Sequence, residues 1–288
     1  MRFGIDPEFG LWAEFTVSTP HGSATQRLRW IEAGSFRMGS PESEPMRNSN
    51  EGPRHWVTLT RGFWLADTAC TQALWQAVMG TNPSHFTGDP QRPVEQVSWD
   101  EAQRFLRALE ALLPGCEAAL PTEAQWEYAC RAGSETPFSF GGNITPEQVN
   151  YDGNSPYAGG AKGRHREETV PVKSLPANAW GLYEMHGNVW EWCADGLRSY
   201  DEQAQQDPAG PVSGDEEAPR VVRGGSWLSV AGGLRSAYRS EGRRDGRDEF
   251  LGGQGFRFAL RSIEPGQVPA PVQGRPGRPA APGGRQAR

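Results

Sequence analysis

The sequence lacks a long hydrophobic segment. No stretch of its 288 residues approaches the ~18 consecutive apolar residues that a membrane-spanning helix needs. The first ten residues, Met1–Gly10, also lack the uninterrupted apolar core of a secretory signal peptide. We therefore expect a cytoplasmic protein that makes no membrane contact.

Cysteine is scarce. Cys70, Cys116, Cys130 and Cys193 are the four in the chain, and no two of them form a CxxC pair. A disulfide framework or a zinc site would need closer and more regular spacing. The five histidines show no HxxxH pairing of the kind that holds a metal on a helix. We expect the four thiols to be buried, where cysteine behaves as a small hydrophobic residue.

The chain also lacks an excess of positive charge. It carries 29 lysine and arginine residues against 35 aspartate and glutamate residues, a formal net charge of −6. This balance gives no general attraction to nucleic acid or to an anionic membrane. We expect no nucleic-acid partner for the main part of the chain.

Glycine and proline, in contrast, are abundant, with 36 and 24 residues. They favour many turns and short elements over a helical bundle. The 11 tryptophans predict that a few large aromatic side chains provide much of the buried area. The length suits one large domain or two small ones, because single cores stop growing near ~250–300 residues.

Alternating apolar and polar residues predict antiparallel strands over residues 11–17 and 27–38. Residues 55–60 and 62–66 are expected to pair with each other around a turn at Arg61-Gly62. Thr71 is expected to cap a helix that ends at Gly80. Ser98–Glu101 forms a capping box for a second helix that runs to Pro114, and Thr122–Gln125 opens a third that stops at Gly133.

Residues 134–180 are rich in glycine, proline, asparagine and serine but also contain aromatic residues, which predicts an ordered, irregular layer. Asn143, Asn150, Asp152 and Asn154 supply oxygen atoms that could satisfy its backbone or a cation. Residues 263–288 are rich in proline, glycine and arginine without apolar periodicity, which predicts a disordered tail.

Several separated motifs carry a family resemblance. They are GLYEMHGNVWEW at 181–192, RGGSW at 223–227, GFR at 255–257, and further blocks at 31–40, 93–100, 120–129 and 169–172. In order and spacing, these motifs resemble the formylglycine-generating-enzyme or sulfatase-modifying-factor family over about residues 28–261. The resemblance implies an α+β fold similar to the C-type lectin fold, loop-rich with short antiparallel strands and few helices. It also implies a domain at 28–262, preceded by a strand extension at 1–27 and followed by the tail at 263–288.

The resemblance implies a catalytic cysteine pair just after the Gly-Gly-Ser element. Here those two positions hold Ser229 and Leu234, although Ser226 matches an active-site serine of the family. The oxidase chemistry needs thiolates, which bind copper(I) and engage the substrate thiol. We expect no catalytic residues and no copper.

The resemblance also implies calcium. Position by position, one site would use the side chains of Glu184 and Glu191 with the carbonyls of Gly187 and Val189. The alternative is that Glu191 caps backbone amides and the neighbouring tryptophans only pack. A second family site would use Asn150 and Tyr151. Arginines in the segment 163–167, where an acid is expected, weigh against that second site.

The segment 227–254 mixes exposed apolar, small and charged residues, as antibody-like contact surfaces do. It resembles the variable region of C-type-lectin-fold proteins that are diversified by retroelements. Its candidate ligand-binding residues are Trp227, Leu228, Ser229, Val230, Tyr238, Arg239, Arg244, Asp248 and Phe250. Its arginines could instead brace the loop through internal ion pairs.

These observations lead to the hypothesis of a non-catalytic, monomeric module that binds a protein or peptide through residues 227–254. Two alternatives stay open: an oxidase that acts on protein cysteine, and a purely structural subunit whose contacts lie on the strands and the tail.

Overall fold

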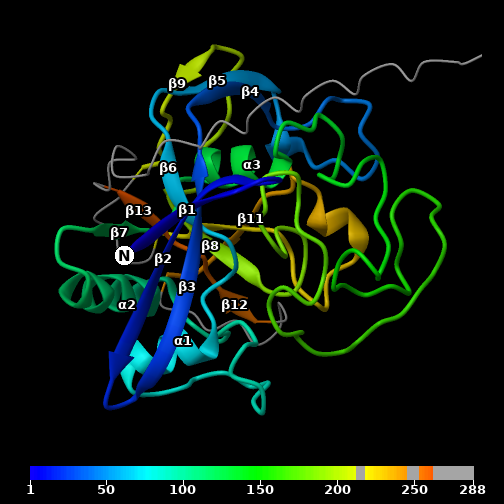
Figure 1. Cartoon of the computed structure of the whole chain (residues 1–288). Coiled ribbons are helices and arrows are strands. Elements are labelled where there is room, and N and C mark those ends of the chain that lie inside the picture. The colour runs from blue at the N-terminus through cyan, green and yellow to red at the C-terminus, as the bar shows by residue number, and fades with distance from the viewer. Residues whose placement is uncertain (212–217, 245–252, 262–288) are drawn as a thin grey trace, which may run out of the picture.

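A computed structural model of the protein describes residues 1–211, 218–244 and 253–261. Its largest sheet has six strands, and all neighbouring strands in it are antiparallel (Figure 1). In spatial order these strands are β1 (Arg2–Asp6), β2 (Gly10–Thr19), β3 (Gly22–Ile31), β6 (Phe63–Ala66), β13 (Ala259–Arg261) and β7 (Glu117–Ala119). The N-terminal hairpin of β2 and β3 thus lies in the same sheet as β13, the last strand of the described chain.

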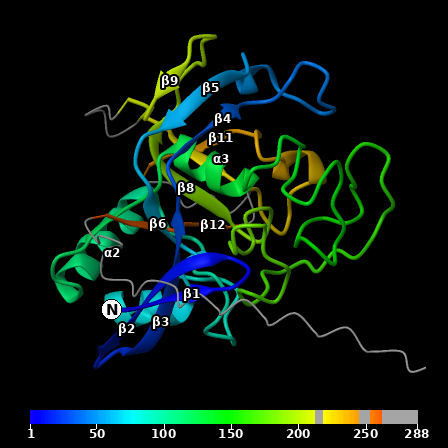
Figure 2. The same ribbon diagram turned by 45° about the horizontal axis from the view of Figure 1, so that its top comes forward.

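Two smaller sheets complete the strand content of the described residues. One has four strands in the order β11 (Ser240–Gly242), β10 (Arg220–Arg223), β8 (Trp190–Gly196) and β12 (Gln254–Gly255). The other has three, in the order β4 (Gly34–Met38), β5 (His55–Leu59) and β9 (Gln205–Gln206). Figure 2 shows the three-stranded sheet stacked above α3 (Glu123–Arg131), with β8 beneath that helix.

The three predicted helices are present, and each begins at the predicted cap. Thr71 accepts a hydrogen bond from Leu74 at the start of α1 (Gln72–Met79), and Ser98 and Glu101 form a capping box at α2 (Trp99–Leu112). Thr122 and Gln125 do the same for α3. Two short 3-10 helices, η1 (Ser49–Glu51) and η2 (Ala231–Leu234), lie in loops. None of the helices among the described residues has the length and apolarity to cross a membrane.

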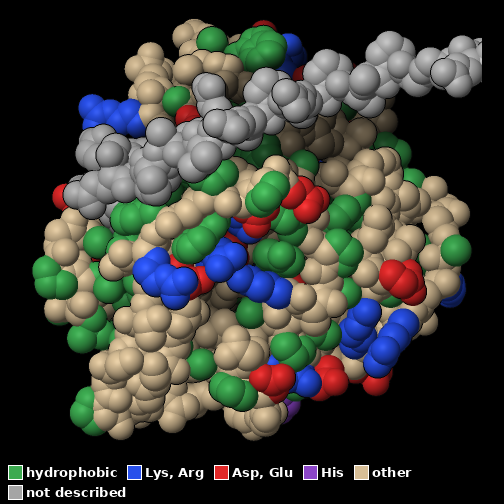
Figure 3. All heavy atoms as spheres, in the orientation of Figure 1, with side chains coloured by type: hydrophobic (Ala, Val, Ile, Leu, Met, Phe, Trp, Pro, Cys, Tyr) green, Lys and Arg blue, Asp and Glu red, His purple; other side chains and the backbone are tan. Residues whose placement is uncertain are grey.

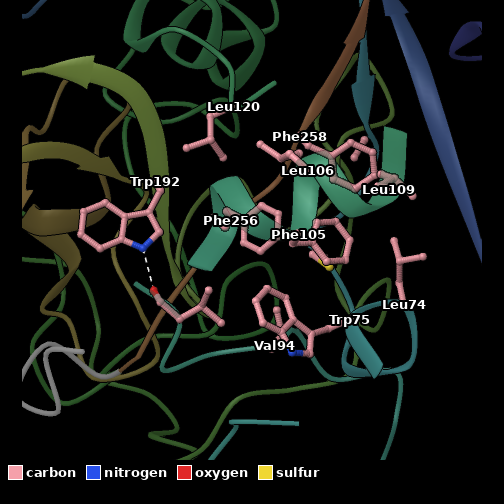
Figure 4. Close-up of a cluster of buried hydrophobic side chains, with 14 of the residues drawn as sticks. Leu74, Trp75, Val94, Phe105, Leu106, Leu109, Leu120, Trp192, Phe256 and Phe258 are labelled. Atoms are coloured by element: carbon pink, nitrogen blue, oxygen red, sulfur yellow. Dashed lines mark hydrogen bonds between the residues drawn. The ribbon is translucent and has the colours of Figure 1, made fainter. Parts of the chain in front are cut away.

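The main core forms where α1 and α2 pack against the six-stranded and four-stranded sheets. Phe105 of α2 stacks on Trp75 of α1 at 5.3 Å, and both rings contact Phe256 (Figure 4). Trp192 of β8 closes the cluster and donates its indole N–H to the Val97 carbonyl at 2.8 Å. A buried tryptophan needs such a partner, so this bond fixes β8 against the segment before α2.

Residues 134–180 form the expected irregular layer, which contains no helix or strand longer than an isolated bridge. The layer lies on the side of the molecule opposite α2, together with η2 (Figures 1 and 2). Its buried aromatic residues, Phe138, Tyr151 and Tyr157, pack with Ala231 and Leu234 of η2 in a separate cluster. This contact attaches the predicted functional loop to the irregular layer.

Two strand predictions are wrong in detail. The segment 27–38 is not one strand but parts of β3 and β4, which belong to different sheets. Residues 55–60 and 62–66 do not pair with each other, because β5 joins β4 and β9 whereas β6 joins β3 and β13. Local alternation gives no information about which strand lies alongside. The predicted tail, 263–288, is outside the described residues.

Candidate functional site

The motifs at 181–192, 223–227 and 255–257 meet in the four-stranded sheet. Glu191 of β8 lies opposite Arg223 of β10 on one side and opposite Gly255 of β12 on the other. The backbone N–H of Gly187 donates to the carbonyl of Gly224 at 2.8 Å, which joins the first motif to the second. Segments far apart in sequence thus form one frame, and the loop after Ser226 emerges from it.

That loop is fastened to the irregular layer by backbone hydrogen bonds. The N–H of Asp152 donates to Ser229 at 3.0 Å, and the N–H of Ala231 donates to Ser155 at 3.1 Å. Further along, the N–H of Ser236 donates to Pro137 at 2.7 Å. Because its backbone groups are already satisfied, the loop is held in one shape before any ligand arrives.

Ser229 and Leu234, at the family's cysteine positions, lie close together. Both side chains face Gly225: a Cβ built on this glycine would be 3.0 Å from Leu234 Cγ and 3.4 Å from Ser229 Oγ. Gly225 has φ of +73°, a conformation that glycine adopts without strain. Ser229 Oγ accepts a hydrogen bond from the backbone N–H of Ser226 at 2.9 Å. The geometry brings together a hydroxyl and an apolar side chain.

The four cysteines lie elsewhere. Cys70, Cys130 and Cys193 are fully buried, and Cys116 is half-buried after α2. Cys130 comes nearest to the loop, with its sulfur 3.7 Å from Ser236 Oγ and 3.7 Å from His186 Nε2. Burial raises the pKa of Cys130 to about 12 and lowers that of His186 to about 4, so the thiol and the imidazole are both neutral at pH 7. This pair is a packing contact rather than an activated nucleophile.

An exposed apolar patch lies on the loop. Leu228 and Val230 are 43% and 45% exposed, whereas the residues that follow them, 231–237, are buried. Met46, 51% exposed, comes from a different part of the chain and lies against Gly232. Met46, Leu228 and Val230 are three of the seven large apolar side chains that the described residues expose. We call these three residues the apolar patch.

Trp227, the residue before Leu228, lines a cavity of about 470 Å³. Its ring meets that of Phe86 edge-on at 5.3 Å, and His165 stacks on it at 6.1 Å. Besides Trp227 and Phe86, the walls include His85, Glu95, Glu167 and Gly253. We call this the Trp227 cavity. The sequence did not reveal which residues surround Trp227 in this cavity. Glu95 offered one signal, because a carboxylate there lies between two apolar residues, Val94 and Val97, that are both buried.

Tyr238 and Arg239 were expected to contact a ligand, but both point inward. Arg239 is 2% exposed and forms hydrogen bonds to both carboxylate oxygens of Glu123, at 2.6 and 2.9 Å. Tyr238 is half-buried and packs against the main core, with its ring 6.1 Å from that of Trp190. For Arg239, the alternative interpretation of an arginine that braces the loop fits its placement. Arg239 is thus unavailable to a partner, whereas Tyr238 keeps part of its surface exposed.

Arg244 lies beside a different cavity. Its guanidinium donates to Asp100 at 2.6 Å and lies over the Trp99 ring, at the start of α2. That cavity shares no lining residue with the Trp227 cavity. The structure therefore does not bring Arg244 together with Trp227. Asp248 and Phe250, the remaining candidates, lie outside the described residues.

Glu191 is not placed to bind calcium. Arg257 donates to both of its carboxylate oxygens, at 2.7 and 2.8 Å, and the indole N–H of Trp126 donates at 2.7 Å. A calcium ion on these oxygens would replace a buried, paired guanidinium, so Glu191 does not fit the four-ligand site. The carboxylate caps no backbone amide either; its partners are the side chains of Arg257 and Trp126.

Other oxygens nearby do remain free. Glu184 Oε2 and Asn150 Oδ1 are buried without a hydrogen-bond partner among the described residues. Burial raises the pKa of Glu184 to about 8. Tyr151 is also buried, and the carbonyl of Gly187 accepts from the N–H of Val189 at 3.0 Å. Across residues 1–211, 218–244 and 253–261, no three His, Cys, Asp or Glu side chains are grouped as metal ligands.

Comparisons with known proteins agree with the motifs. Residues 14–262 match the sulfatase-modifying factor enzyme 1-like domain family. The formylglycine-generating enzyme of Streptomyces coelicolor is 33% identical over 258 residues, which cover 86% of this chain and 74% of that protein.

Solved structures are similar as well. Treponema denticola variable protein 1 has a TM-score of 0.70 at 28% identity, covering 86% of this chain and 99% of that one. PvdO from Pseudomonas aeruginosa has a TM-score of 0.65 at 26% identity, with coverage of 86% and 97%. The expected α+β, loop-rich fold of the C-type-lectin-like class is confirmed by these likenesses and by the strands and helices observed.

Proposed function

Because this chain belongs to the sulfatase-modifying factor enzyme 1-like family, we propose that it uses the family scaffold to bind a protein or peptide without oxidase chemistry. The binding surface consists of the apolar patch and the neighbouring Trp227 and Ser229. The chain acts in the cytoplasm as a monomer. The single observation that carries this proposal is an exposed apolar patch on a loop whose backbone is already fastened.

The chemistry of the loop supports a non-catalytic role. Oxidation of a thiol through copper(I) needs soft sulfur ligands, and a hydroxyl cannot take their place. The two positions that converge on Gly225 offer Ser229 and Leu234. Burial raises the pKa of each of the four cysteines, which disfavours the thiolate that would bind metal or attack a substrate.

The exposure of the loop supports binding. Apolar side chains that lie together on a surface mark contact sites more often than scattered ones do. Trp227 adds a large aromatic side chain, a residue type that often carries binding energy at protein interfaces. The Treponema denticola relative is named a variable protein. That name supports the further proposal that part of segment 227–254 varies between copies of this chain.

Binding is tested with matched pairs of variants. Partners are captured from an extract of the source organism, identified, and titrated against the purified chain. L228A/V230A should weaken binding at least about tenfold, since both side chains lose contact area. I5A/L112A removes two apolar side chains of similar exposure, 42% each, from other surfaces and should bind as the wild type does. Equal affinity of L228A/V230A and wild type would overturn the proposed surface. Loss in I5A/L112A alone would favour the structural-subunit alternative.

Catalysis is tested with a gain of sulfur. The S229C/L234C variant restores thiols at the two converging positions and serves as the positive control for an anaerobic copper(I) titration. Wild type should show no stoichiometric copper–thiolate absorption and no conversion of a peptide cysteine to formylglycine, whereas the variant should bind copper. Turnover by the wild type would reject the binding module in favour of the oxidase.

A structural calcium ion is a separate proposal. The buried, unpartnered Glu184 Oε2 is a hard oxygen donor that suits such an ion, whereas Glu191 is already paired with Arg257. Asn150 Oδ1, also buried and unpartnered, belongs to the second candidate site. The ion would neutralise a carboxylate that burial otherwise keeps protonated.

A further inference from the structure

We propose that the Trp227 cavity binds a positively charged side chain of the partner, a lysine or an arginine. This inference rests on the proposed binding function and adds the chemistry of one anchor residue. The cavity is about 470 Å³, within the ~300–1,000 Å³ range of pockets that hold small ligands, and is larger than one side chain requires. Trp227 in its wall directly precedes Leu228 in the chain, so we expect a partner that covers the apolar patch to reach the cavity with one side chain.

Glu95 supplies a buried carboxyl group; burial raises its pKa, and the backbone N–H of Phe86 and the neighbouring His85 oppose that rise. Its side chain lines the cavity although the residue is only 2% exposed. Oε1 accepts the backbone N–H of Phe86 at 2.9 Å. Among the described residues, no arginine or lysine forms an ion pair with this carboxylate. A buried carboxylate without a cationic partner is costly, and an incoming ammonium or guanidinium would compensate it.

The close approach of Gly253 holds Glu95 at the cavity wall. A Cβ on Gly253 would lie 3.0 Å from Glu95 Cβ, and its φ of +90° is a conformation that other residues rarely adopt. The backbone N–H of Glu95 donates to Ser84 Oγ at 3.2 Å, which fixes the segment from the other side. The carboxyl group is thus positioned by backbone packing and by the backbone N–H of Phe86, with His85 beside it in the cavity wall.

Aromatic rings supply the second feature of a cation site. Trp227 and Phe86 form an edge-to-face pair in the cavity wall, with an interplanar angle of 89°. The negative face of an aromatic ring attracts a cation, with tryptophan the strongest of the three aromatic residues. Rings combined with a buried carboxylate favour an organic cation that can make apolar contacts as well as an ion pair.

Glu167 adds a second negative charge at the exposed part of the wall. Glu95 and Glu167 are the two carboxyl groups in the cavity wall, and either can pair with a cation that enters the cavity. Among the described residues, no third His, Cys, Asp or Glu side chain joins them as a metal ligand. The aromatic rings beside the two carboxyl groups favour an organic cation, a lysine or arginine side chain, over a metal ion.

The test uses a small probe that carries only the proposed group. Nα-acetyl-arginine N-methylamide is titrated into the ¹⁵N-labelled chain, and the indole resonance of Trp227 is followed after its identification with W227F. We expect a saturable shift. The citrulline analogue, a neutral isostere, should bind at least about tenfold more weakly, because it lacks the charge.

Variants then identify the carboxylate. E95Q keeps an oxygen that can accept the Phe86 N–H and should weaken the arginine probe at least about tenfold, while E167Q should have a smaller effect because exposed charges are screened. E117Q alters an exposed glutamate on β7 and serves as the matched control. If E95Q fails to fold, E167Q must still weaken the probe in circular-dichroism-verified folded protein. Equal binding of arginine and citrulline probes, or displacement of the probe by equimolar calcium, would overturn the proposal.

Loss of the natural partner in L228A/V230A but full binding in E95Q would leave the binding function standing and reject only the cation site.

Discussion

At the scale of single residues, Glu184 is a buried side chain whose protonation affects the fold. It is 8% exposed, and Oε1 accepts the backbone N–H of Lys173 at 2.9 Å while Oε2 has no partner in the described structure. Burial raises its pKa from 4.5 to about 8. In the absence of a cation, the carboxyl is therefore protonated at neutral pH.

This shift gives a prediction with a definite sign. The folded state holds this proton more tightly than the unfolded state, so the stability that Glu184 contributes is fully present below pH 4.5 and is lost as the pH rises from there through about 8. E184Q stays neutral and should escape that loss. In chelator at pH 8, we expect E184Q to be more stable than wild type by at most ~3–5 kcal/mol, with the difference shrinking toward pH 4.5. Urea unfolding at a series of pH values measures it.

Calcium should reverse the order of the two proteins. An ion that binds only the folded state raises the melting temperature of the wild type. It competes with the proton on Glu184, so the effect should grow as the pH rises toward 8. E184Q should show no such rise, and E117Q should behave as wild type. A wild-type melting temperature that is the same in about 1 mM calcium and in chelator would reject the ion. A pH-independent difference between E184Q and wild type would reject the titration.

The sequence predicted part of the candidate site at this scale. Trp227 ends one recognisable motif, and Leu228 and Val230 follow it in the segment before the next motif at 255–257. Leu228 and Val230 are exposed. Glu95 could not be linked to Trp227, because nothing local connects a residue before α2 with a loop after β10. Arg239 was wrongly placed on the surface, since its burial depends on Glu123, which is distant in sequence.

At the scale of elements, the capping box of α2 is a local feature that the structure reproduces. Ser98 Oγ accepts from the N–H of Glu101 at 3.2 Å, and Glu101 Oε2 accepts from the N–H of Ser98 at 2.9 Å. S98A leaves one N–H of the first turn without its partner and should destabilise the protein by ~1 kcal/mol. That corresponds to a fall of about 2–4 °C in melting temperature for a domain of this size.

The control for S98A is S43A, which changes an exposed serine in a loop. It should alter stability by less than ~0.5 kcal/mol. Calorimetry on both variants separates the cap from the general effect of losing a hydroxyl. A loss in S98A no larger than in S43A would show that neighbouring water satisfies the helix start as well as serine does.

Helices could be predicted more fully than strands, for a physical reason. A helix start depends on residues three apart, such as Thr122 and Gln125, so the sequence alone contains its signal. A strand depends on a partner that can come from anywhere in the chain. β12 is two residues long and exists because it pairs with β8. No pattern within Gln254-Gly255 could have predicted it.

At the scale of the whole molecule, buried arginines connect the late part of the chain to earlier parts. Four arginines with exposures of 2% or less are paired with acids: Arg223 with Glu123 and Glu127, Arg235 with Glu44 and Glu51, Arg239 with Glu123, and Arg257 with Glu191. These pairs hold the β8–β10 frame against α3 and the 44–51 segment. On the surface in Figure 3, by contrast, basic and acidic side chains are interspersed.

Composition cannot distinguish the charged side chains that are buried in ion pairs from those that lie on the surface. The sequence gives a net charge of −6 and many arginines after residue 220 but does not show which of them are buried. Burial of an arginine requires the whole fold, because its acids come from other elements. The family motifs contain Arg223 and Arg257, but the roles of their guanidiniums became clear only with Glu127 and Glu191 in place.

Arg235 provides the clearest test of this network, because it joins the functional loop to a distant segment. Its guanidinium donates to Glu44 at 2.7 Å and to both oxygens of Glu51 at 2.6 and 2.7 Å. It also donates to the carbonyls of Gly232 and Met46, which places Met46 beside the loop. R235M keeps much of the volume but leaves two buried carboxylates unpaired, and should destabilise the fold by ~3–5 kcal/mol.

Removing the two orphaned charges should restore stability. E44Q/E51Q/R235M carries no unpaired carboxylate at these sites and is expected to recover at least about half of the loss, as measured by denaturant unfolding. R107M, at an exposed arginine of α2, is the matched control and should cost less than ~0.5 kcal/mol. If the triple variant is no more stable than R235M, the loss comes from packing and not from charge. Met46 belongs to the apolar patch, and the triple variant still lacks the hydrogen bond from Arg235 that positions it. The triple variant should therefore bind the partner more weakly than wild type even though its stability is restored.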